Sequence, residues 1–227
     1  TAEILLAHVL GFKRVDLYIE YDRPLNPREL AIFKETIKRR LKGEPVAYIV
    51  GERGFWSLEL YVTPDVLIPR PETEMVVETS LDVLKENRTS GRQRVLDLGT
   101  GSGAILLALA TERPGYLFYG TDRSGKALRI AKENARKYGL EDRVHFLCGD
   151  WLSPLAEDRN GFDLIVSNPP YIRRDEVDDL AIEISKYEPR GALDGGWDGL
   201  DAIRVLIHQA PKFIVPSGWL IFEIGYD

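Results

Sequence analysis

Cysteine is nearly absent from this sequence, which carries only Cys148 among its 227 residues. A single thiol cannot form an intrachain disulfide, so the class of disulfide-stapled secreted domains is excluded and a reducing setting is expected. No apolar run reaches the roughly 18 residues that a membrane span needs, and no signal-peptide pattern opens the chain. We therefore predict a cytoplasmic protein with no membrane partner.

Histidine and runs of like charge are also scarce. The three histidines, His8, His145 and His208, are scattered along the chain, and we interpret them as structural or surface residues rather than as a general base. We predict no metal site. The formal net charge is −6, and an acidic chain is a poor match for bare nucleic acid, where neutralisation of phosphates dominates affinity. No direct nucleic-acid partner is therefore expected.

The chain divides into regions of different character. Residues 1–44 have a helical pattern, in which Asn26 and Pro27 form a helix start and apolar residues follow at helical spacing up to Leu41. Because the chain opens inside this pattern without a methionine, we expect this N-terminal domain to be incomplete. Residues 45–70 resemble a β-hairpin followed by prolines, and we interpret them as a connector.

From residue 71 onward, predicted helices alternate with short apolar strands. Strands are expected at 94–98, 116–121, 144–148, 162–167 and 219–224, and helices at about 72–84, 104–110, 126–138 and 202–210. This alternation predicts an α/β fold with a doubly wound, mostly parallel sheet over residues 71–227. Such sheets bind ligands beyond the carboxyl ends of their strands.

The first of these strands runs into a glycine-rich loop. Its residues are Asp97, Leu98, Gly99, Thr100, Gly101, Ser102 and Gly103, followed by Ala104. Glycines at this spacing let the backbone turn tightly and approach a ligand that side chains would block. Asp122 ends the next strand, where a carboxylate can accept hydrogen bonds from both hydroxyls of a ribose. The spacing also fits the dinucleotide fingerprint, so these residues indicate an adenosine ligand and leave NAD and S-adenosylmethionine both open.

Three further positions favour S-adenosylmethionine. Asp97 lies within the strand before the glycines, where a buried carboxylate needs a partner such as the ammonium group of this cofactor. Asp150 and Trp151 directly follow the third strand, where an acid beside an aromatic residue can hold the adenine amino group and stack on the ring. We therefore predict S-adenosylmethionine as the cofactor and S-adenosylhomocysteine as its product.

The fourth strand ends in Ser167-Asn168-Pro169-Pro170-Tyr171. Consecutive prolines make a stiff loop without donors, and Asn168 is extended because it precedes a proline. The side-chain oxygen of Asn168 and the carbonyl of Pro169 can each accept one hydrogen of a substrate NH2 group. Tyr171 offers a ring face for a planar group.

This arrangement meets a chemical need of planar nitrogens. An amide or exocyclic amine is a poor nucleophile because its lone pair is delocalised. Two acceptors that hold the NH2 group favour a lone pair aimed at a methyl group and stabilise the positive charge that develops on nitrogen. Catalysis is then mostly positioning. We predict Asn168, Pro169, Pro170 and Tyr171 as catalytic and substrate-binding residues, with Asn168 also contacting the cofactor.

With these motifs the sequence resembles the HemK/PrmC family, the protein-glutamine N5-methyltransferases that modify class 1 peptide chain release factors. The resemblance covers nearly the whole chain and is carried by residues 43–46, 51–56, 68–73, 96–104, 122, 150–151, 167–172 and 187–193. The Asn168–Tyr171 tetrapeptide alone is shared with DNA adenine and RNA guanine N-methyltransferases. The hairpin and the Pro69–Thr73 segment are more specific.

The resemblance implies a class I S-adenosylmethionine-dependent methyltransferase fold and a role for each matched position. Gly99 to Gly103 and Asp122 would hold the cofactor, and Trp151 would lie against its adenine. The tetrapeptide would hold the glutamine amide of a Gly-Gly-Gln motif, with Phe55 and Arg70 lining the pocket. The N-terminal domain would dock the release factor. Family members also carry further C-terminal strands, which this sequence does not contain after residue 224.

Other functions fit part of the sequence. An N-methyltransferase acting on adenine N6 or guanine N2 of a nucleic acid would share the fold, the cofactor and the tetrapeptide, but the net charge opposes it. An NAD-dependent oxidoreductase would fit the glycine loop but has no use for Asn168–Tyr171. A catalytically silent scaffold that binds S-adenosylmethionine would not need the acceptors at Asn168 and Pro169.

Overall fold

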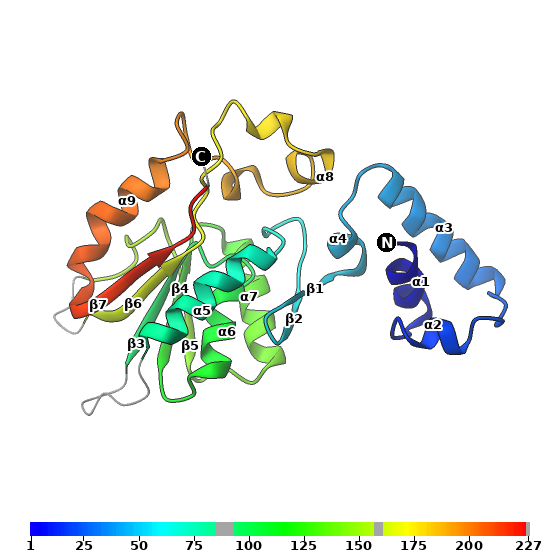
Figure 1. The fold of residues 1–227 in the computed structure, drawn as a ribbon, viewed down its shortest axis with the longest axis horizontal. Coiled ribbons are helices and arrows are strands. Elements are labelled where there is room, and N and C mark those ends of the chain that lie inside the picture. Colours follow the sequence, from blue (N-terminus) through cyan, green and yellow to red (C-terminus); the bar gives the residue numbers. More distant parts are fainter. Residues whose placement is uncertain (85–92, 157–160, 226–227) are drawn as a thin grey trace.

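The computed structural model describes residues 1–84, 93–156 and 161–225. A helical N-terminal unit lies to one side of a twisted sheet that is flanked by helices, with a small hairpin between them (Figure 1). None of the helices in the described ranges has the length and apolar character needed to cross a membrane.

The N-terminal unit contains three helices, α1 (Ala2–Leu10), α2 (Asp16–Ile19) and α3 (Pro27–Leu41). The predicted helix start is confirmed, because the Asn26 side chain accepts from the backbone N–H of Glu29 while Glu29 accepts from the backbone N–H of Asn26. This reciprocal pair satisfies two of the donors that a helix start leaves free. Leu5 is fully buried where α1 packs against α3.

The hairpin is present where the sequence predicted it, as β1 (Glu52–Phe55) and β2 (Leu58–Tyr61). A short helix that was not predicted, α4 (Val46–Val50), precedes it. Its residues favour strands, and a short apolar run does not distinguish the two structures by pattern alone. The fully buried side chain of Asn134 exchanges hydrogen bonds of 2.7 and 3.0 Å with the backbone of Tyr61, and also donates to the carbonyl of Ser102 at 2.9 Å. The hairpin is thereby tied to the glycine loop.

Across the part of the chain that the structure describes, the central sheet has five strands in the order β5-β4-β3-β6-β7, and every pairing is parallel. The strands are β3 (Arg94–Leu98), β4 (Leu117–Asp122), β5 (Val144–Cys148), β6 (Phe162–Ser167) and β7 (Ile214–Phe222). The chain moves outward from β3 to β5 and then returns to the other side of β3 to form β6. This reversal opens a crevice at the carboxyl ends of β3 and β6, the place where such sheets bind ligands.

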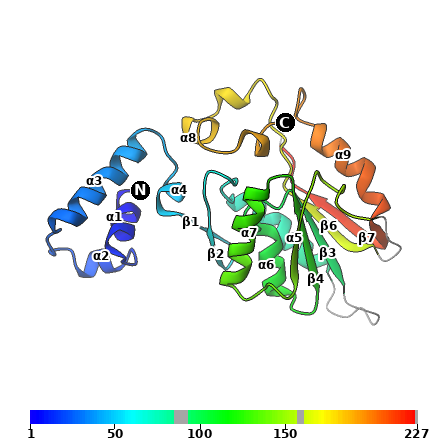
Figure 2. The same cartoon turned by 180° about the vertical axis from the view of Figure 1, so that it is seen from behind.

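Helices cover both faces of the sheet, as predicted. One face packs against α5 (Glu74–Val83), α6 (Ala104–Glu112) and α7 (Gly125–Lys137), with Leu106, Leu107 and Leu109 fully buried. The other face packs against α9 (Asp201–Gln209) through Leu96, Leu98 and Leu206. In both views α9 lies on the opposite side of the sheet from α5, α6 and α7 (Figure 2).

Some boundaries differ from the sequence prediction. The last strand begins at Ile214 rather than near 219, because Ser217 adopts a φ of 67° and a register shift lets the strand continue past Pro216. A short 3-10 turn, η1 (Pro71–Thr73), precedes α5, which begins at Glu74 rather than 72. The chain between β6 and β7 also holds short helical turns that the pattern did not reveal, η2 (Val177–Asp179), α8 (Ile182–Ser185), η3 (Arg190–Ala192) and, after α9, η4 (Ala210–Lys212).

Candidate active site

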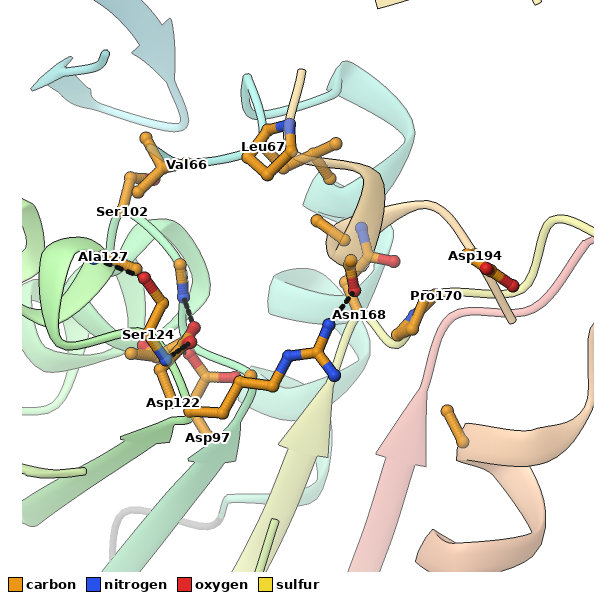
Figure 3. A pocket seen from close by; sticks show the side chains of 18 of the residues that line it. Val66, Leu67, Asp97, Ser102, Asp122, Ser124, Ala127, Asn168, Pro170 and Asp194 are labelled. Carbon is orange, nitrogen blue, oxygen red and sulfur yellow. Dashed lines mark hydrogen bonds between the residues drawn. The ribbon is translucent and has the colours of Figure 1, made fainter. Parts of the chain in front are cut away.

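A cavity of about 520 Å³ opens at the carboxyl ends of the central strands. Asp97 and Asp122 lie on one side of it, Asn168 and Pro170 lie on the opposite side, and Val66 and Leu67 border the space between them (Figure 3). The cavity therefore joins the predicted nucleotide loop and the predicted tetrapeptide in one site.

The glycine loop presents its backbone to this cavity. Gly99, Gly101 and Gly103 all have positive φ values, of 73°, 57° and 85°, which a residue with a side chain would adopt only under strain. The N–H groups of Gly99 and Thr100 both donate to the carbonyl of Thr121, each at 2.9 Å. The loop is thus anchored to β4, and the bare backbone of Gly99 and Gly101 lies against the cavity, where a ligand can approach closely.

Asp122 ends β4 with both carboxylate oxygens held by backbone donors. Oδ2 accepts from the N–H of Gly101 at 3.0 Å, and Oδ1 accepts from the N–H of Ser124 at 2.8 Å. These two bonds fix the orientation of the carboxylate, and each oxygen keeps a lone pair for a ligand that reaches it. A rigid carboxylate with two available acceptors fits the adjacent hydroxyls of a ribose.

Asp97 is a buried carboxyl group with one oxygen unpaired. It is 1% exposed, and its Oδ2 accepts from the hydroxyl of Thr100 at 2.6 Å. No group among the described residues forms a hydrogen bond with Oδ1. Burial, with a smaller contribution from the charge of Asp122, raises the pKa of Asp97 to about 7. Because a buried acceptor without a partner is costly, this lining residue fits a ligand that brings a cationic donor, such as an ammonium group.

Trp151 and Asp150 border the cavity beyond β5. Trp151 is half-buried, has a φ of 50° and directs its ring towards Gly99. Asp150 is exposed. An aromatic face beside an acid at this position can stack on a heterocycle and accept from its amino group.

Asn168 is held by a neighbour that the sequence did not single out for this role. Its Nδ2 donates to the hydroxyl of Thr73 at 2.9 Å, and the hydroxyl of Tyr171 donates to Glu223 Oε1 at 3.0 Å. Pro170 lines the cavity beside Asn168, Pro169 is buried, and Tyr171 is half-buried. The structure thus brings Asn168 and Pro170 to the cavity wall, while the Tyr171 hydroxyl is engaged by Glu223.

Of the two additional pocket residues that the family resemblance suggested, one lines the cavity and the other does not. Arg70 lines the cavity and pairs with Glu188, whose side chain is 1% exposed and whose second oxygen accepts from the N–H of Ile68 at 3.2 Å. Phe55 does not line the cavity: it is 2% exposed and packs in the core on the α5–α6 side of the sheet. The prediction for Phe55 is corrected because the alternation of β1 turns this side chain towards the core.

Sequence reasoning assigned no role to three residues that shape this site. Thr73 and Glu188 fall in segments that carried the family resemblance, but nothing local to either residue indicates its partner. Glu223 follows the last strand, and no motif in the sequence includes it. All three act through hydrogen bonds to residues far away in the sequence.

The site combines a parallel α/β sheet, this glycine loop, an acid at the end of β4 and Asn-Pro-Pro-Tyr directly after β6. Together these features define the class of S-adenosylmethionine-dependent methyltransferases. Family models agree: the PrmC N-terminal domain model matches residues 1–51, and a methyltransferase domain model matches residues 90–192. The chain is 47% identical to a release factor glutamine methyltransferase of Coxiella burnetii, over 100% of this chain and 78% of the relative. It is 45% identical to one of Geobacter sulfurreducens, over 98% of this chain and 75% of the relative. The chain belongs to the release factor glutamine methyltransferase family.

Solved structures show the same fold. A methyltransferase of Agrobacterium tumefaciens described as S-adenosylmethionine-dependent aligns with a TM-score of 0.53 and 20% identity, over 76% of this chain and 52% of that one. The human methyltransferase 10 domain containing protein aligns with a TM-score of 0.51 and 20% identity, over 79% of this chain and 74% of that one. At this identity the likeness concerns the fold alone.

Proposed function

We propose that this chain transfers a methyl group from S-adenosylmethionine to the side-chain amide nitrogen of the glutamine in the Gly-Gly-Gln motif of a class 1 peptide chain release factor. The observation that carries the proposal is that Asp97 and Asp122 lie in the same cavity as Asn168, on the opposite side of it (Figure 3). A nucleotide-type cofactor and a planar NH2 group can meet there. Family membership supports the choice of substrate.

The cofactor side of the site has a partner for each part of S-adenosylmethionine. Asp122 would accept from the ribose hydroxyls, and the unpaired Oδ1 of Asp97 would accept from the ammonium group. Trp151 and Asp150 would flank the adenine. When bound, the cofactor supplies an electrophilic methyl group on a sulfonium centre.

The substrate side holds the amide so that its nitrogen can act as the nucleophile. Asn168 Oδ1 and the carbonyl of Pro169 would each accept one N–H, and both bonds strengthen as positive charge develops on nitrogen. A new nitrogen–carbon bond forms while the sulfur–carbon bond breaks, and the proton then lost from nitrogen goes to water. No base is required before transfer, because the charge that makes this proton acidic appears only as the bond forms.

The N-terminal unit would dock the release factor. Its contacts with the methyltransferase domain include the ion pair of Arg40 with Glu183 at 2.8 Å and a hydrogen bond from the Tyr187 hydroxyl to the carbonyl of Lys42 at 3.1 Å. The Glu183–Tyr187 stretch leads directly into Glu188 beside the cavity, so a docked protein would lie close to the site. The translation substrate and the single cysteine support a cytoplasmic setting.

Binding of the cofactor is expected to weaken below about pH 7. Because the pKa of Asp97 is raised to about 7, at lower pH its carboxyl group carries a proton that must leave before it can pair with an ammonium group. Each pH unit below the pKa then costs about 1.4 kcal/mol, or about tenfold in Kd. Calorimetric titration with S-adenosylhomocysteine should show this slope in the wild type and a flat, weaker profile in Asp97→Asn. The same slope in both proteins would contradict the role of Asp97.

The unliganded protein should show the opposite trend in stability. Between the ordinary pKa of 3.8 and the raised value of about 7, the folded state keeps a proton that the unfolded state has released, so the contribution of Asp97 to stability falls as the pH rises through this window. The Tm of thermal unfolding should therefore fall more between low and neutral pH in the wild type than in Asp97→Asn.

The proposed function is tested by incubating the protein with labelled S-adenosylmethionine and a purified class 1 release factor. The same factor with its motif glutamine changed to alanine is the matched control. Label on the first and none on the second is the expected result. Label on RNA or DNA, with none on the release factor, would replace the proposal by nucleic-acid amine methylation.

A further inference from the structure

A chain of three hydrogen bonds lies behind Asn168, and each bond joins residues distant in the sequence. Asn168 Nδ2 donates to Thr73 Oγ1 at 2.9 Å, and the Thr73 hydroxyl donates to Glu223 Oε2 at 2.7 Å. Glu223 Oε1 accepts from the Tyr171 hydroxyl at 3.0 Å. Thr73 is 4% exposed and borders the cavity.

The donor and the acceptor of each of these hydrogen bonds follow from which group carries a proton. A carboxylate has no proton to give, so Glu223 accepts from both hydroxyls. Burial and the nearby charge of Glu223 raise the pKa of Tyr171 to about 12, which keeps the tyrosine hydroxyl a donor. The hydroxyl of Thr73 has one proton and gives it to Glu223, so towards Asn168 it can only accept.

Thr73 therefore selects one of the two orientations of the Asn168 amide. The NH2 end must face Thr73, and the Oδ1 end must face away from it. No described donor forms a hydrogen bond with Oδ1, and Asn168 lines the cavity opposite Asp122 (Figure 3). In the reversed orientation the NH2 group of Asn168 would face the NH2 group of the substrate amide. Two hydrogen-bond donors would then oppose each other.

We propose that Thr73 and Glu223 are positioning residues that lock the Asn168 side chain with its acceptor oxygen towards the substrate amide. The inference rests on the proposed function for its consequence in turnover. Its structural content, the fixed orientation of the Asn168 amide, does not depend on the identity of the substrate.

The kinetic test compares Thr73→Val, which keeps the shape and loses the hydroxyl, with Thr73→Ser, which keeps the hydroxyl. Thr73→Val is expected to lower kcat about 10- to 100-fold, a smaller loss than removal of the acceptor itself because the Asn168 side chain is still present, with the Kd of S-adenosylhomocysteine unchanged. Thr73→Ser should recover turnover to near the wild-type rate. Thr111→Val is the matched control, because the hydroxyl of Thr111 donates to the carbonyl of Ala108 within its own helix, α6. Failure of serine to rescue turnover would overturn the proposal.

Two further variants separate positioning from general damage. Glu223→Gln should also lower kcat, because a glutamine NH2 group can donate to the hydroxyl of Thr73. The proton of Thr73 would then be free to point at Asn168 and favour the reversed amide. In an Asn168→Ala background, Thr73→Val should cause no further loss, since the residue through which it acts is gone. Additive losses would overturn the proposal.

A spectroscopic test does not need a methyl-accepting substrate. The side-chain NH2 resonances of Asn168 are assigned by their absence in Asn168→Ala, and they should shift in Thr73→Val but not in Thr111→Val. Unshifted resonances would overturn the positioning role. If the resonances shift in Thr73→Val but the wild-type protein does not methylate the release factor, the positioning role is supported and the proposed function is rejected.

Discussion

Replacing Asn168 by alanine is expected to lower turnover by about 10²–10³, the usual effect of removing one oriented donor or acceptor from a transition state. The change removes the acceptor on one hydrogen of the substrate amide and leaves the opposite wall of the cavity intact. Asp97, Asp122 and Trp151 keep their positions, so the affinity for S-adenosylhomocysteine should stay within about twofold of the wild type. Single-turnover methyl transfer and calorimetry on the same preparations measure the two quantities.

Asn168→Gln is the sharper comparison for this prediction. It keeps an amide of the same chemistry but moves it by one methylene group, out of reach of the fixed hydroxyl of Thr73. If positioning carries the catalysis, Asn168→Gln should be nearly as slow as Asn168→Ala. Turnover near the wild-type rate in Asn168→Ala would show that the amide is held by other groups.

Replacing Asp122 by alanine is expected to weaken cofactor binding by about 10²-fold. Hydrogen bonds to a charged group contribute about 1.5–3 kcal/mol each, and about 2.7 kcal/mol corresponds to this factor. The variant also leaves the N–H groups of Gly101 and Ser124 without their acceptor, so the glycine loop should loosen and add to the loss. Calorimetric titration with S-adenosylhomocysteine gives the value.

Asp122→Asn and Asp142→Ala are the controls for this effect. The Asp122→Asn variant would keep one carbonyl acceptor and most of the side-chain shape, so its affinity should fall between those of the wild type and Asp122→Ala. Asp142 is an exposed acid that precedes β5, at the opposite end of the strand from Cys148, and its removal should leave the affinity unchanged. A wild-type affinity in Asp122→Ala would refute the ribose role.

Much of the site could be predicted because its main residues are close to strand ends. Asp97 lies in β3 and the glycine loop follows that strand, Asp122 ends β4, and Asn168 follows β6. Two of these segments carry a strong local signal, the glycines after the first apolar strand and the consecutive prolines after the fourth, and Asp122 is marked by its place at the end of the strand between them. Once the alternation of helices and strands indicates a parallel sheet, the carboxyl ends of these strands must share one edge. Local chemistry and topology together therefore placed Asp97, Asp122 and Asn168 around one cavity.

Phe55 shows where this reasoning fails. Family resemblance suggested a pocket residue, but a four-residue strand has only two faces, and the packing of the hairpin on the sheet decides which one is buried. The phenylalanine faces the core beside Leu58 and Leu60. Alternation places Phe55 on the same face as Leu58 and Leu60, and only the packing of the hairpin decides whether that face meets the core or the cavity.

The fold class, the glycine loop and the tetrapeptide follow from the amino-acid sequence alone, because helix and strand periodicity and turn chemistry are properties of neighbouring residues. The direction in which the Asn168 amide points is settled by tertiary packing instead. Its partner Thr73 lies 95 residues away, and Glu223 lies 150 residues from Thr73. Hydrogen bonds between segments so far apart exist only after the helices and strands have packed, and a threonine or glutamate has no local pattern that names its distant partner.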